Sequence, residues 1–586
     1  MRLRIDWRSI SLALLALAAL AGCSDQETPA PAGTQGVQLR FHLAEPSGVQ
    51  AQYVSAGTGG VSLQVGQQAP LDYILPVPTC SGTSCSKSVT ESDGALSSCT
   101  RSATGVSCTL EVPLPPGTYP LTVVTYAQKP NPDFSGDTPL SEGTLQVTVL
   151  PGQTNQLSLT LGAVVASAGL TPRNSNLIYT SSSSGTTNYD IAAARSVPET
   201  FLLTLYDASG QAIPLGSAGA PEVTLCAVSP QELQVAPAGS PGQYVLQALH
   251  SFGSQAQRLY LAEGSSCTGP ELDQYDQPVP IPLPTITETQ ALFVSNSGLN
   301  SSGTGYYSSI TAYTAHGNPL SFQVSGAFSL GSLAFNSQTG WLYAVLQGSP
   351  GSVAAYLLPS GTAQTLASPI ASLNYPGGLA FNPATGWLYV ATENSSSGNV
   401  DVYGARTGAP VSLAHPITTS QVVFGMAIDP VNGQLYVANN SGSGAANTVS
   451  SYDAVSGAVV PPTITQDLGS PSGVAFDPYN GQLYVTNQRT SNFASTVTSY
   501  VAQSGQEVTL AQPITSSSDP TLSGPDAIAF DLQDRLLYVV NLHTETVQAY
   551  QPDGALVSLS GGATSGGAIA TPTSSGFAPN GIAIVP

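Results

Sequence analysis

The chain has 586 residues, which is too long for one ordinary domain, so we expect two to four domains. Only 8% of the residues are charged, against about 25% in an average soluble protein, and Gly (59) and Pro (46) are abundant. This composition predicts an all-β protein. The net charge of −21 and the scarcity of lysine exclude nucleic acid and anionic membrane surfaces as direct partners, because both require clustered cations.

The N-terminus carries an export signal. Three arginines within the first eight residues precede an apolar run over 10–20, which is too short to span a membrane. The run ends in Leu20-Ala21-Gly22-Cys23, and this ending resembles the lipobox of bacterial lipoproteins. The resemblance implies a signal peptide over 1–22, cleavage before Cys23, and acylation of its thiol by diacylglycerol and palmitate. The alternative is a free structural cysteine behind an ordinary secretory signal.

Residues 23–36 contain two prolines and no apolar run, which predicts a short flexible tether. Ser24, rather than Asp, follows the cysteine, and this resembles the pattern that enterobacteria send on to the outer membrane. We therefore expect a cell-envelope protein that contacts the membrane through its lipid anchor only. The outer membrane or the cell surface is favoured over the inner membrane.

Six further cysteines remain, and an even number in an exported chain favours disulfides. Their spacing suggests the pairs Cys80 with Cys85, Cys99 with Cys108, and Cys226 with Cys267. Four cysteines allow three connectivities, so the first two pairs stay open. A zinc site is the alternative, but the sequence has no Cys-x-x-Cys and no histidine beside a cysteine, so no metal ligands are assigned.

Short β-branched and apolar segments, separated by Gly, Pro and Ser, fill residues 37–162 and predict a first β-sandwich. The approach to one of these strands, Pro115–Tyr119, is similar to that of bacterial Ig-like and transthyretin-like modules. A second β-sandwich is expected over 163–275, where Phe201–Ile213 resembles the opening of Ig-like repeats. Alternating prolines over 276–285 predict a stiff, extended linker.

Residues 286–586 contain a repeat. Aligned on a Leu-Tyr-Val core, its copies are separated by 50, 46, 47, 48 and 54 residues and centre on Phe293, Tyr343, Tyr389, Tyr436, Tyr484 and Tyr538. Such a period predicts propeller blades. A motif of the type Gly473–Phe476 precedes each of the last five copies, and the first copy lacks it. The missing strand recurs at the C-terminus, over 579–585, so we expect a six-bladed β-propeller closed by the C-terminal strand.

The repeat resembles the YVTN and NHL families of β-propellers. Tyr484-Val485-Thr486-Asn487 is the motif that gives the first family its name, and Tyr436–Asn439 is close to it. Blades two and six depart from the motif at Tyr343–Leu346 and Tyr538–Asn541. The resemblance covers about 300 residues and implies the propeller fold. Ahead of it we expect the two Ig-like β-sandwiches.

Strand direction sorts the loops of such a propeller onto two faces. Tight turns join the first to the second strand and the third to the fourth, so they share one face; the long, variable loops share the other. Binding residues concentrate on such loops, so we expect the site there, around the central channel. The candidates are Glu393, Asn439, Asn487, Arg489, Asp526, Asn541, His543, Glu545 and Asn580. The alternative for the recurrent asparagines is hydrogen bonding to the loop backbone, and for the others a solvated surface side chain.

No motif of catalysis or of cofactor binding is visible. The five histidines are scattered, and the chain has no Gly-x-Ser-x-Gly elbow, phosphate-binding loop, dinucleotide fingerprint or EF-hand loop. We therefore assign no catalytic residue and no cofactor. A propeller can nevertheless assemble a site from residues far apart in the sequence.

Three functions stay open. The leading one is a non-enzymatic, lipid-anchored binding module for an envelope protein or a glycan. The second is a propeller hydrolase, such as a lactonase, with a divalent metal held by Glu393, Asn439, Asn487 and Asp526. The third is a structural surface spacer.

Overall fold

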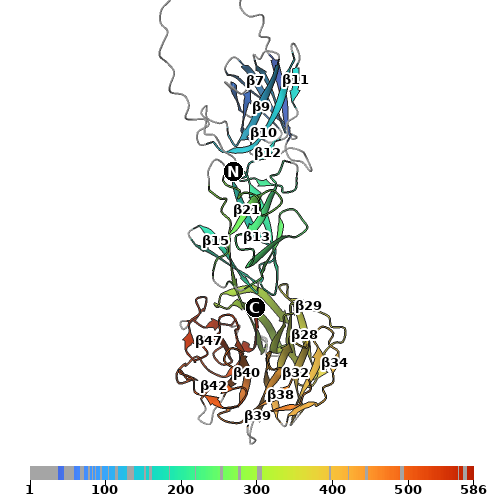
Figure 1. The fold of residues 1–586 in the computed structure, drawn as a ribbon, viewed down its shortest axis with the longest axis vertical. Coiled ribbons are helices and arrows are strands. Elements are labelled where there is room, and N and C mark those ends of the chain that lie inside the picture. The colour runs from blue at the N-terminus through green and yellow to red at the C-terminus, as the bar shows by residue number, and fades with distance from the viewer. Residues whose placement is uncertain are drawn as a thin grey trace, which may run out of the picture.

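The computed structural model consists of strands and connecting loops (Figure 1), which confirms the all-β prediction. It describes residues 37–586 except 45–57, 66–70, 77–79, 82–83, 86, 93–94, 103–104, 113–116, 129–136, 151–153, 158–160, 184, 194, 218, 251, 253–254, 275–278, 300–305, 327, 395–396, 420, 442–446, 489–493, 565–566 and 572–576. The expected signal peptide, the tether with Cys23, and Arg489 lie outside the described residues. In the described part of the chain, no helix is long and apolar enough to cross a membrane.

The first segment contains two five-stranded sheets. One has the order β11 (Thr154–Leu157), β1 (Val37–Ala44), β8 (Gly105–Val112), β7 (Ala95–Ser102), β6 (Lys87–Ser92). The other has the order β12 (Gly162–Ala163), β10 (Pro139–Val149), β9 (Gly117–Tyr126), β2 (Gly60–Val65), β3 (Leu71–Pro76). Alternate residues of β9 are buried, as period-two packing requires. The sequence did not reveal β6 and β7, because they are rich in Ser and Thr and lack apolar alternation.

Two of the expected cysteine pairs lie opposite each other in the backbone register. Cys80 in β4 (Cys80–Ser81) faces Cys85 in β5 (Ser84–Cys85). Cys99 in β7 faces Cys108 in β8, and Cys108 is disulfide-bonded. These registers agree with the spacing argument for both pairs.

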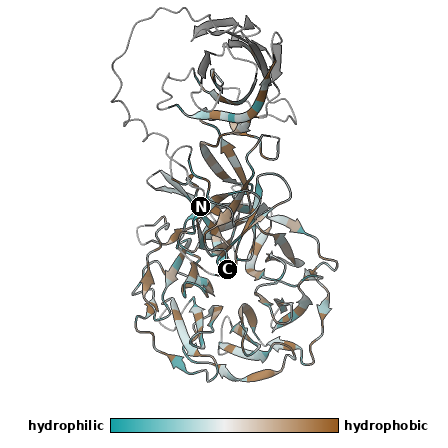
Figure 2. Cartoon of the chain, turned by 45° about the horizontal axis from the view of Figure 1, so that its top comes forward, coloured by the Kyte–Doolittle hydropathy of each residue, from teal (hydrophilic) through white to brown (hydrophobic). Residues whose placement is uncertain are grey.

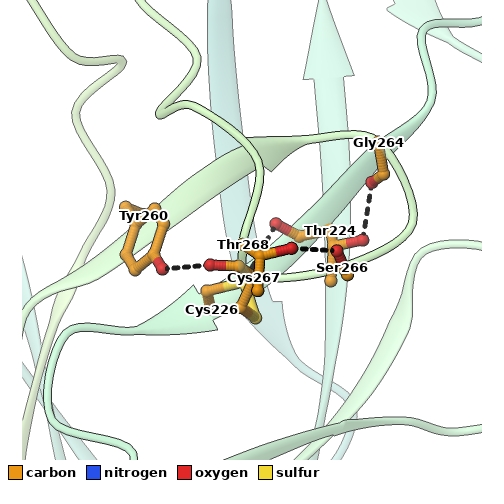
Figure 3. The surroundings of a disulfide bond; sticks show 7 residues. All are labelled: Thr224, Cys226, Tyr260, Gly264, Ser266, Cys267 and Thr268. Carbon is orange, nitrogen blue, oxygen red and sulfur yellow. Dashed lines mark hydrogen bonds between the residues drawn. A yellow bond between two sulfur atoms is a disulfide. The ribbon is translucent and has the colours of Figure 1, made fainter.

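The middle segment contains three sheets, where one two-sheet sandwich was expected. The largest combines β13 (Ser167–Pro172), β16 (Glu199–Tyr206), β20 (Gln243–Ala248) and β19 (Leu233–Pro237), with β17 (Ala212–Ile213) beside β16. The other two combine β14 (Ile178–Ser183), β15 (Thr186–Ala192) and β22 (Thr285–Thr289), and β18 (Val223–Ala227) with β21 (Leu259–Glu263). The predicted disulfide between Cys226 and Cys267 is present and ties β18 to the turn after β21 (Figure 3).

The stretch over 276–285, which was expected to be a stiff, extended linker, packs against the middle segment in its second half. Ile281 is 3% exposed and packs in the core of the middle segment. The chain then enters β22, which pairs in parallel with β15. Ile281, between two of the prolines, buries apolar area that a free spacer would leave in water, so this stretch is packed.

Six antiparallel sheets, called ring sheets 1 to 6, follow one another around a ring (Figure 2). Sheet 1 combines β50 (Phe577–Val585), β23 (Ala291–Leu299), β24 (Tyr306–Thr314) and β25 (Pro319–Gly326). Sheet 2 has β26 (Ser329–Asn336), β27 (Trp341–Gln347), β28 (Gly351–Leu357), β29 (Thr362–Gln364) and β30 (Ala371–Leu373). Sheet 3 has β31 (Leu379–Asn382), β32 (Trp387–Asn394), β33 (Ser397–Gly404), β34 (Pro410–Val411) and β35 (Ile417–Thr419).

Sheet 4 has β36 (Val422–Asp429), β37 (Gln434–Asn440), β38 (Thr448–Asp453) and β39 (Val459–Ile464). Sheet 5 has β40 (Pro471–Asp477), β41 (Gln482–Asn487), β42 (Thr496–Val501), β43 (Glu507–Val508) and β44 (Ile514–Thr515). Sheet 6 has β45 (Pro525–Phe530), β46 (Leu537–Asn541), β47 (Thr546–Tyr550), β48 (Leu556–Val557) and β49 (Ile569–Ala570). The innermost strands contact one another in turn, and β50 pairs with β23 at the place predicted from the repeat.

Glycine allows the inner strands to come together. A Cβ atom on Gly378 would lie 2.5 Å from the carbonyl oxygen of Phe424, and one on Gly425 would lie 2.3 Å from that of Ser472. Both distances are shorter than a van der Waals contact, so only glycine fits at these two positions. This is the physical reason for the glycine of the repeat motif.

The recurrent tyrosines tie neighbouring sheets together. The buried hydroxyl of Tyr343 in sheet 2 donates to the carbonyl of Ala405 in sheet 3 at 2.6 Å. Tyr538 in sheet 6 donates to the carbonyl of Ala315, in the turn of sheet 1, at 2.8 Å. Tyr436 differs, because its hydroxyl donates to Gln434 in its own strand. Burial raises the pKa of Tyr343 and Tyr538, so both hydroxyls stay protonated and able to donate.

The middle segment docks on the tight-turn face of the ring. The backbone N–H of Phe322 donates to the carbonyl of Asn176, and the Asn176 amide donates to the carbonyl of Pro359, each at 3.0 Å. Leu177 and Val197 share a core with residues of ring sheets 1 and 2. The face with the long loops is therefore the one opposite this contact.

Candidate functional site

Each ring sheet places one residue at the mouth of the channel by breaking the regular register of its inner strand. In five sheets the register slips there, and in sheet 3 the matching residue lies just before β31. A β-bulge re-aims a side chain, so these positions face the channel rather than a neighbouring sheet. In order from sheet 1 to sheet 6, the six residues are Asn580, Gly331, Gly377, Phe424, Ser472 and Asp526.

These six residues line a cavity of about 300 Å³, which we call the channel cavity. Below them, every sheet contributes one apolar side chain to the wall: Ile582, Leu333, Leu379, Met426, Val474 and Ile528. Among the described residues that line this cavity, Asp526 is the one that carries a charge. The cavity thus combines an apolar wall with one carboxyl group, which is the usual composition of a small-ligand site.

Asp526 is held by Gln488, whose side-chain amide donates to one carboxyl oxygen at 2.8 Å. Burial raises the pKa of Asp526 to about 6, and the hydrogen bond from Gln488 opposes this rise. The carboxyl group therefore changes its charge near neutral pH.

The other two polar bulge residues each form a hydrogen bond with the backbone of the adjacent sheet. The Asn580 amide donates to the carbonyl of Leu330 in sheet 2 at 3.0 Å. The Ser472 hydroxyl donates to the carbonyl of Pro525 in sheet 6 at 2.8 Å. Both side chains thereby fix the spacing of adjacent inner strands at the channel mouth.

The motif asparagines do not face the channel. Asn439 is 3% exposed, and its amide donates to the hydroxyls of Thr448 and Ser450 in the next strand of its own sheet, at 2.9 and 3.1 Å. Asn487 makes the same contact with Thr498 at 2.9 Å. Asn541 is fully buried and donates to Thr546 at 3.5 Å. These asparagines therefore have structural hydrogen bonds. The alternative expected bonds to the loop backbone, whereas the bonds run mainly to side chains of the neighbouring strand.

Two further candidates lie apart from the channel cavity. His543 is exposed, and its Nδ1 lies 3.5 Å from the hydroxyl of Ser523. Glu545 adopts a φ of 54° after β46, and its carbonyl accepts two hydrogen bonds from Thr571. Of the nine predicted residues, the structure thus brings Asp526 and Asn580 into one cavity.

Glu393 lines a second cavity of about 300 Å³, which we call the rim cavity. It shares Gln347, Gly377 and Phe424 with the channel cavity, so the two are adjacent. Its outer wall is Tyr375, in the connection between sheets 2 and 3.

Sequence reasoning missed Tyr375, Gln347 and Phe424. Phe424 offered one signal, because it stands where the repeat carries a small or polar residue in the other five sheets.

The four residues expected to hold a metal ion in the hydrolase alternative do not lie together. Asp526 lies in the channel cavity and Glu393 in the rim cavity, whereas the amides of Asn439 and Asn487 bond within their own sheets. Within the described ranges, no three His, Cys, Asp or Glu side chains gather closely enough to hold one metal ion.

No protein-family model and no curated protein sequence matches this chain. Among solved structures, it is similar to a gluconolactonase from Xanthomonas campestris, at 12% identity over 46% of this chain and 86% of that one, with a TM-score of 0.30. A putative 6-phosphogluconolactonase from Bacteroides uniformis matches at 12% identity over 51% and 99%, with a TM-score of 0.35. A protein from Lactobacillus plantarum matches at 17% identity over 51% and 99%, with a TM-score of 0.33.

Proposed function

We propose that this chain is a lipid-anchored envelope protein whose ring is a six-bladed β-propeller acting as a non-enzymatic binding module. Its partner is an envelope protein or a glycan, held on the loop face around the channel. Residues 37–162 and 163–275 form Ig-like spacers between the ring and an anchor at Cys23. The lipobox-like ending at Cys23 supports the anchor.

The observation that carries this proposal is the channel cavity. All six sheets contribute to it, its wall is apolar, and its mouth carries Asp526 as a partly exposed carboxyl group. The same face points away from the segments that would lead to the anchor, because the middle segment occupies the tight-turn face. A partner outside the membrane can therefore reach the cavity.

A substitution that fills the cavity tests the proposal. Gly331 and Phe424 hold equivalent bulge positions, so Gly331→Phe repeats a side chain that the ring already accommodates. A Cβ atom on Gly331 would lie 3.1 Å from the end of the flexible Gln347 side chain, which can move aside. We expect the variant to fold and to lose binding.

The experiment uses residues 23–586 with Cys23→Ser, immobilised and exposed to envelope material from its own cells, either untreated or treated with protease or periodate. We expect retention by the parent and at least about tenfold weaker retention by Gly331→Phe. Val455→Phe, at an exposed site on the tight-turn face, is the matched control and should bind like the parent. Equal retention by Gly331→Phe and the parent would contradict a site in the channel.

The same protein distinguishes the hydrolase. Calorimetric titration with Ca²⁺ and Mn²⁺ should show no saturable site in the channel if the ring is a plain binding module. One bound ion that is lost in Asp526→Asn would instead favour a metal-dependent hydrolase.

A further inference from the structure

The rim cavity has two exposed aromatic walls. Tyr375, in the connection between sheets 2 and 3, is 59% exposed, and Phe424, in sheet 4, is 44% exposed. Tyr479, another exposed aromatic residue of the propeller-like ring, differs because one face of its side chain has a partner. The Arg535 guanidinium lies 4.7 Å from the centroid of the Tyr479 aromatic ring. Aromatic faces left open beside a cavity mark a place where an apolar surface can be covered by a ligand.

The backbone that carries the two aromatic side chains is held in place before any ligand arrives. Tyr375 has a φ of 38°, in the left-handed region that non-glycine residues rarely adopt. Its N–H donates to the carbonyl of Gly348 at 3.1 Å. The preceding Asn374 accepts a bond from Ser349 at 3.1 Å and exchanges bonds with the backbone of Glu393. Such a conformation persists only where the surroundings enforce it, and it often marks a functional site.

Phe424 owes its direction to the bulge in β36. The register slips between Val423 and Met426, so Phe424 leaves the alternation of the strand and points to the channel mouth. Val423, its neighbour, is fully buried in the core between sheets. The two aromatic walls are therefore preorganised, which reduces the entropy lost on binding.

Polar groups line the same cavity. Gln347 accepts a hydrogen bond from the Ser329 hydroxyl at 3.0 Å, which orients its amide and leaves the amide nitrogen toward Gly331. Glu393 supplies a carboxyl group, whose pKa burial raises. A carboxylate accepts and an amide donates hydrogen bonds, so together they can pair with neighbouring hydroxyl groups.

The charges select the ligand. Among the described residues lining the rim and channel cavities, the charged ones are Glu393 and Asp526, and both are acidic. These two carboxyl groups disfavour an anionic ligand, because like charges repel each other. The open aromatic faces and the hydrogen-bonding groups suit a ligand without negative charge that has an apolar flat side and several hydroxyl groups.

We infer that the rim cavity binds one pyranose ring of an uncharged glycan between Tyr375 and Phe424, with Glu393 and Gln347 on its hydroxyl groups. The inference rests on the proposed function and narrows its partner to a glycan. The C–H face of a pyranose packs on an aromatic ring, and its rim of hydroxyls matches the polar groups. The volume of about 300 Å³ is small for a ligand site and accepts one sugar unit, with the adjacent channel cavity open to the next.

Titration calorimetry with soluble oligosaccharides tests this inference. The probes are maltohexaose and chitohexaose, which are uncharged, and hexagalacturonic acid, which is anionic. We expect an uncharged probe to bind at least about tenfold more tightly than the anionic one. Tyr375→Gly, which accepts the positive φ, and Phe424→Ala should each weaken binding at least about tenfold.

Two variants serve as controls. Tyr375→Phe keeps the aromatic face and should bind within about threefold of the parent, whereas Tyr479→Ala removes an exposed ring on the tight-turn face and should change nothing. Unchanged affinity in Tyr375→Gly and Phe424→Ala, preference for the anionic probe, or no binding of any probe would overturn the inference. If Gly331→Phe still abolishes retention of envelope material in that case, the proposed function stands without the sugar site.

Discussion

Asp526 occupies the bulge position of sheet 6, where the other sheets carry Gly, Phe, Ser or Asn. Burial raises the pKa of its carboxyl group to about 6 from an ordinary value of 3.8, so the folded state holds a proton that the unfolded chain has already released. Its contribution to stability is therefore fully present below pH 3.8 and is lost as the pH rises through 6.

Replacing this carboxyl group should remove the pH dependence that it causes. We expect Asp526→Asn to raise the free energy of unfolding at pH 8 by about 1–2 kcal/mol, an amount reduced because the group is partly exposed, and to change it little at pH 3.5. Urea unfolding of the parent and the variant at the two pH values measures this. A variant less stable than the parent at pH 8 would contradict the assignment.

The inner strand is the element that depends most on a single residue type. A Cβ atom on Gly425 would lie 2.3 Å from the Ser472 carbonyl and 2.8 Å from the Gly473 Cα, and both belong to backbone that cannot move alone. We expect Gly425→Ala to destabilise the ring by about 3 kcal/mol or more, or to prevent folding. Gly162→Ala is the control, because its Cβ atom would lie 3.8 Å from the nearest atom. Urea unfolding compares the two variants, and similar midpoints would show that the close approach of the inner strands does not require glycine at position 425.

Pairs of sheets are joined by the tyrosine hydroxyls, and the tyrosines offer a matched comparison. Tyr538→Phe leaves the buried carbonyl of Ala315 without its donor across the junction of sheets 6 and 1. We expect it to lower the free energy of unfolding by about 1–2 kcal/mol. Tyr436→Phe should lower it by less, because that hydroxyl bonds within its own strand. Thermal unfolding of both variants provides the measurement. Equal losses of unfolding free energy would show that the inter-sheet hydrogen bond stabilises the ring no more than the bond within one strand.

Within the elements, sequence reasoning succeeded where structure is local. The tight turn after Asp477 is such a case, because the Asp477 carboxyl group accepts a hydrogen bond from the N–H of Tyr479 at 2.8 Å and Gly481 takes a positive φ, both within five residues. The role of Asn487 was left open, because its partner Thr498 lies in the next strand. The strands β6 and β7 were missed because their neighbours, rather than their own polarity, place them in a sheet.

The whole molecule depends on ring closure by its last strand. Strand β50 pairs with β23 along nearly its full length and joins the end of the chain to the first ring sheet. Without it, β23 would be an exposed edge and the ring would lose its junction between sheets 6 and 1.

Deleting residues 577–586 should therefore abolish the cooperative unfolding transition of the ring. The N-terminal segments have their own sheets, and the Cys226–Cys267 disulfide stabilises the middle segment. We therefore expect the middle segment of the truncated chain still to unfold in a separate transition. Circular dichroism melting and limited proteolysis measure the two. A truncated chain with the melting temperature of the parent would contradict the dependence on closure.

By itself, the sequence determined the all-β class, the repeat with its period near 50 residues, and the return of the missing strand at the C-terminus. These properties follow from turn chemistry and from alternation, which act over a few residues. Only the tertiary structure decided which side chains face the channel. A bulge inserts one residue and so resets the alternation, and the convergence of six inner strands brings Phe424 beside Tyr375, which lies in the connection between sheets 2 and 3. The candidate site therefore combines the predicted Asp526, Asn580 and Glu393 with residues such as Phe424, which the repeat pattern alone would have placed in the scaffold.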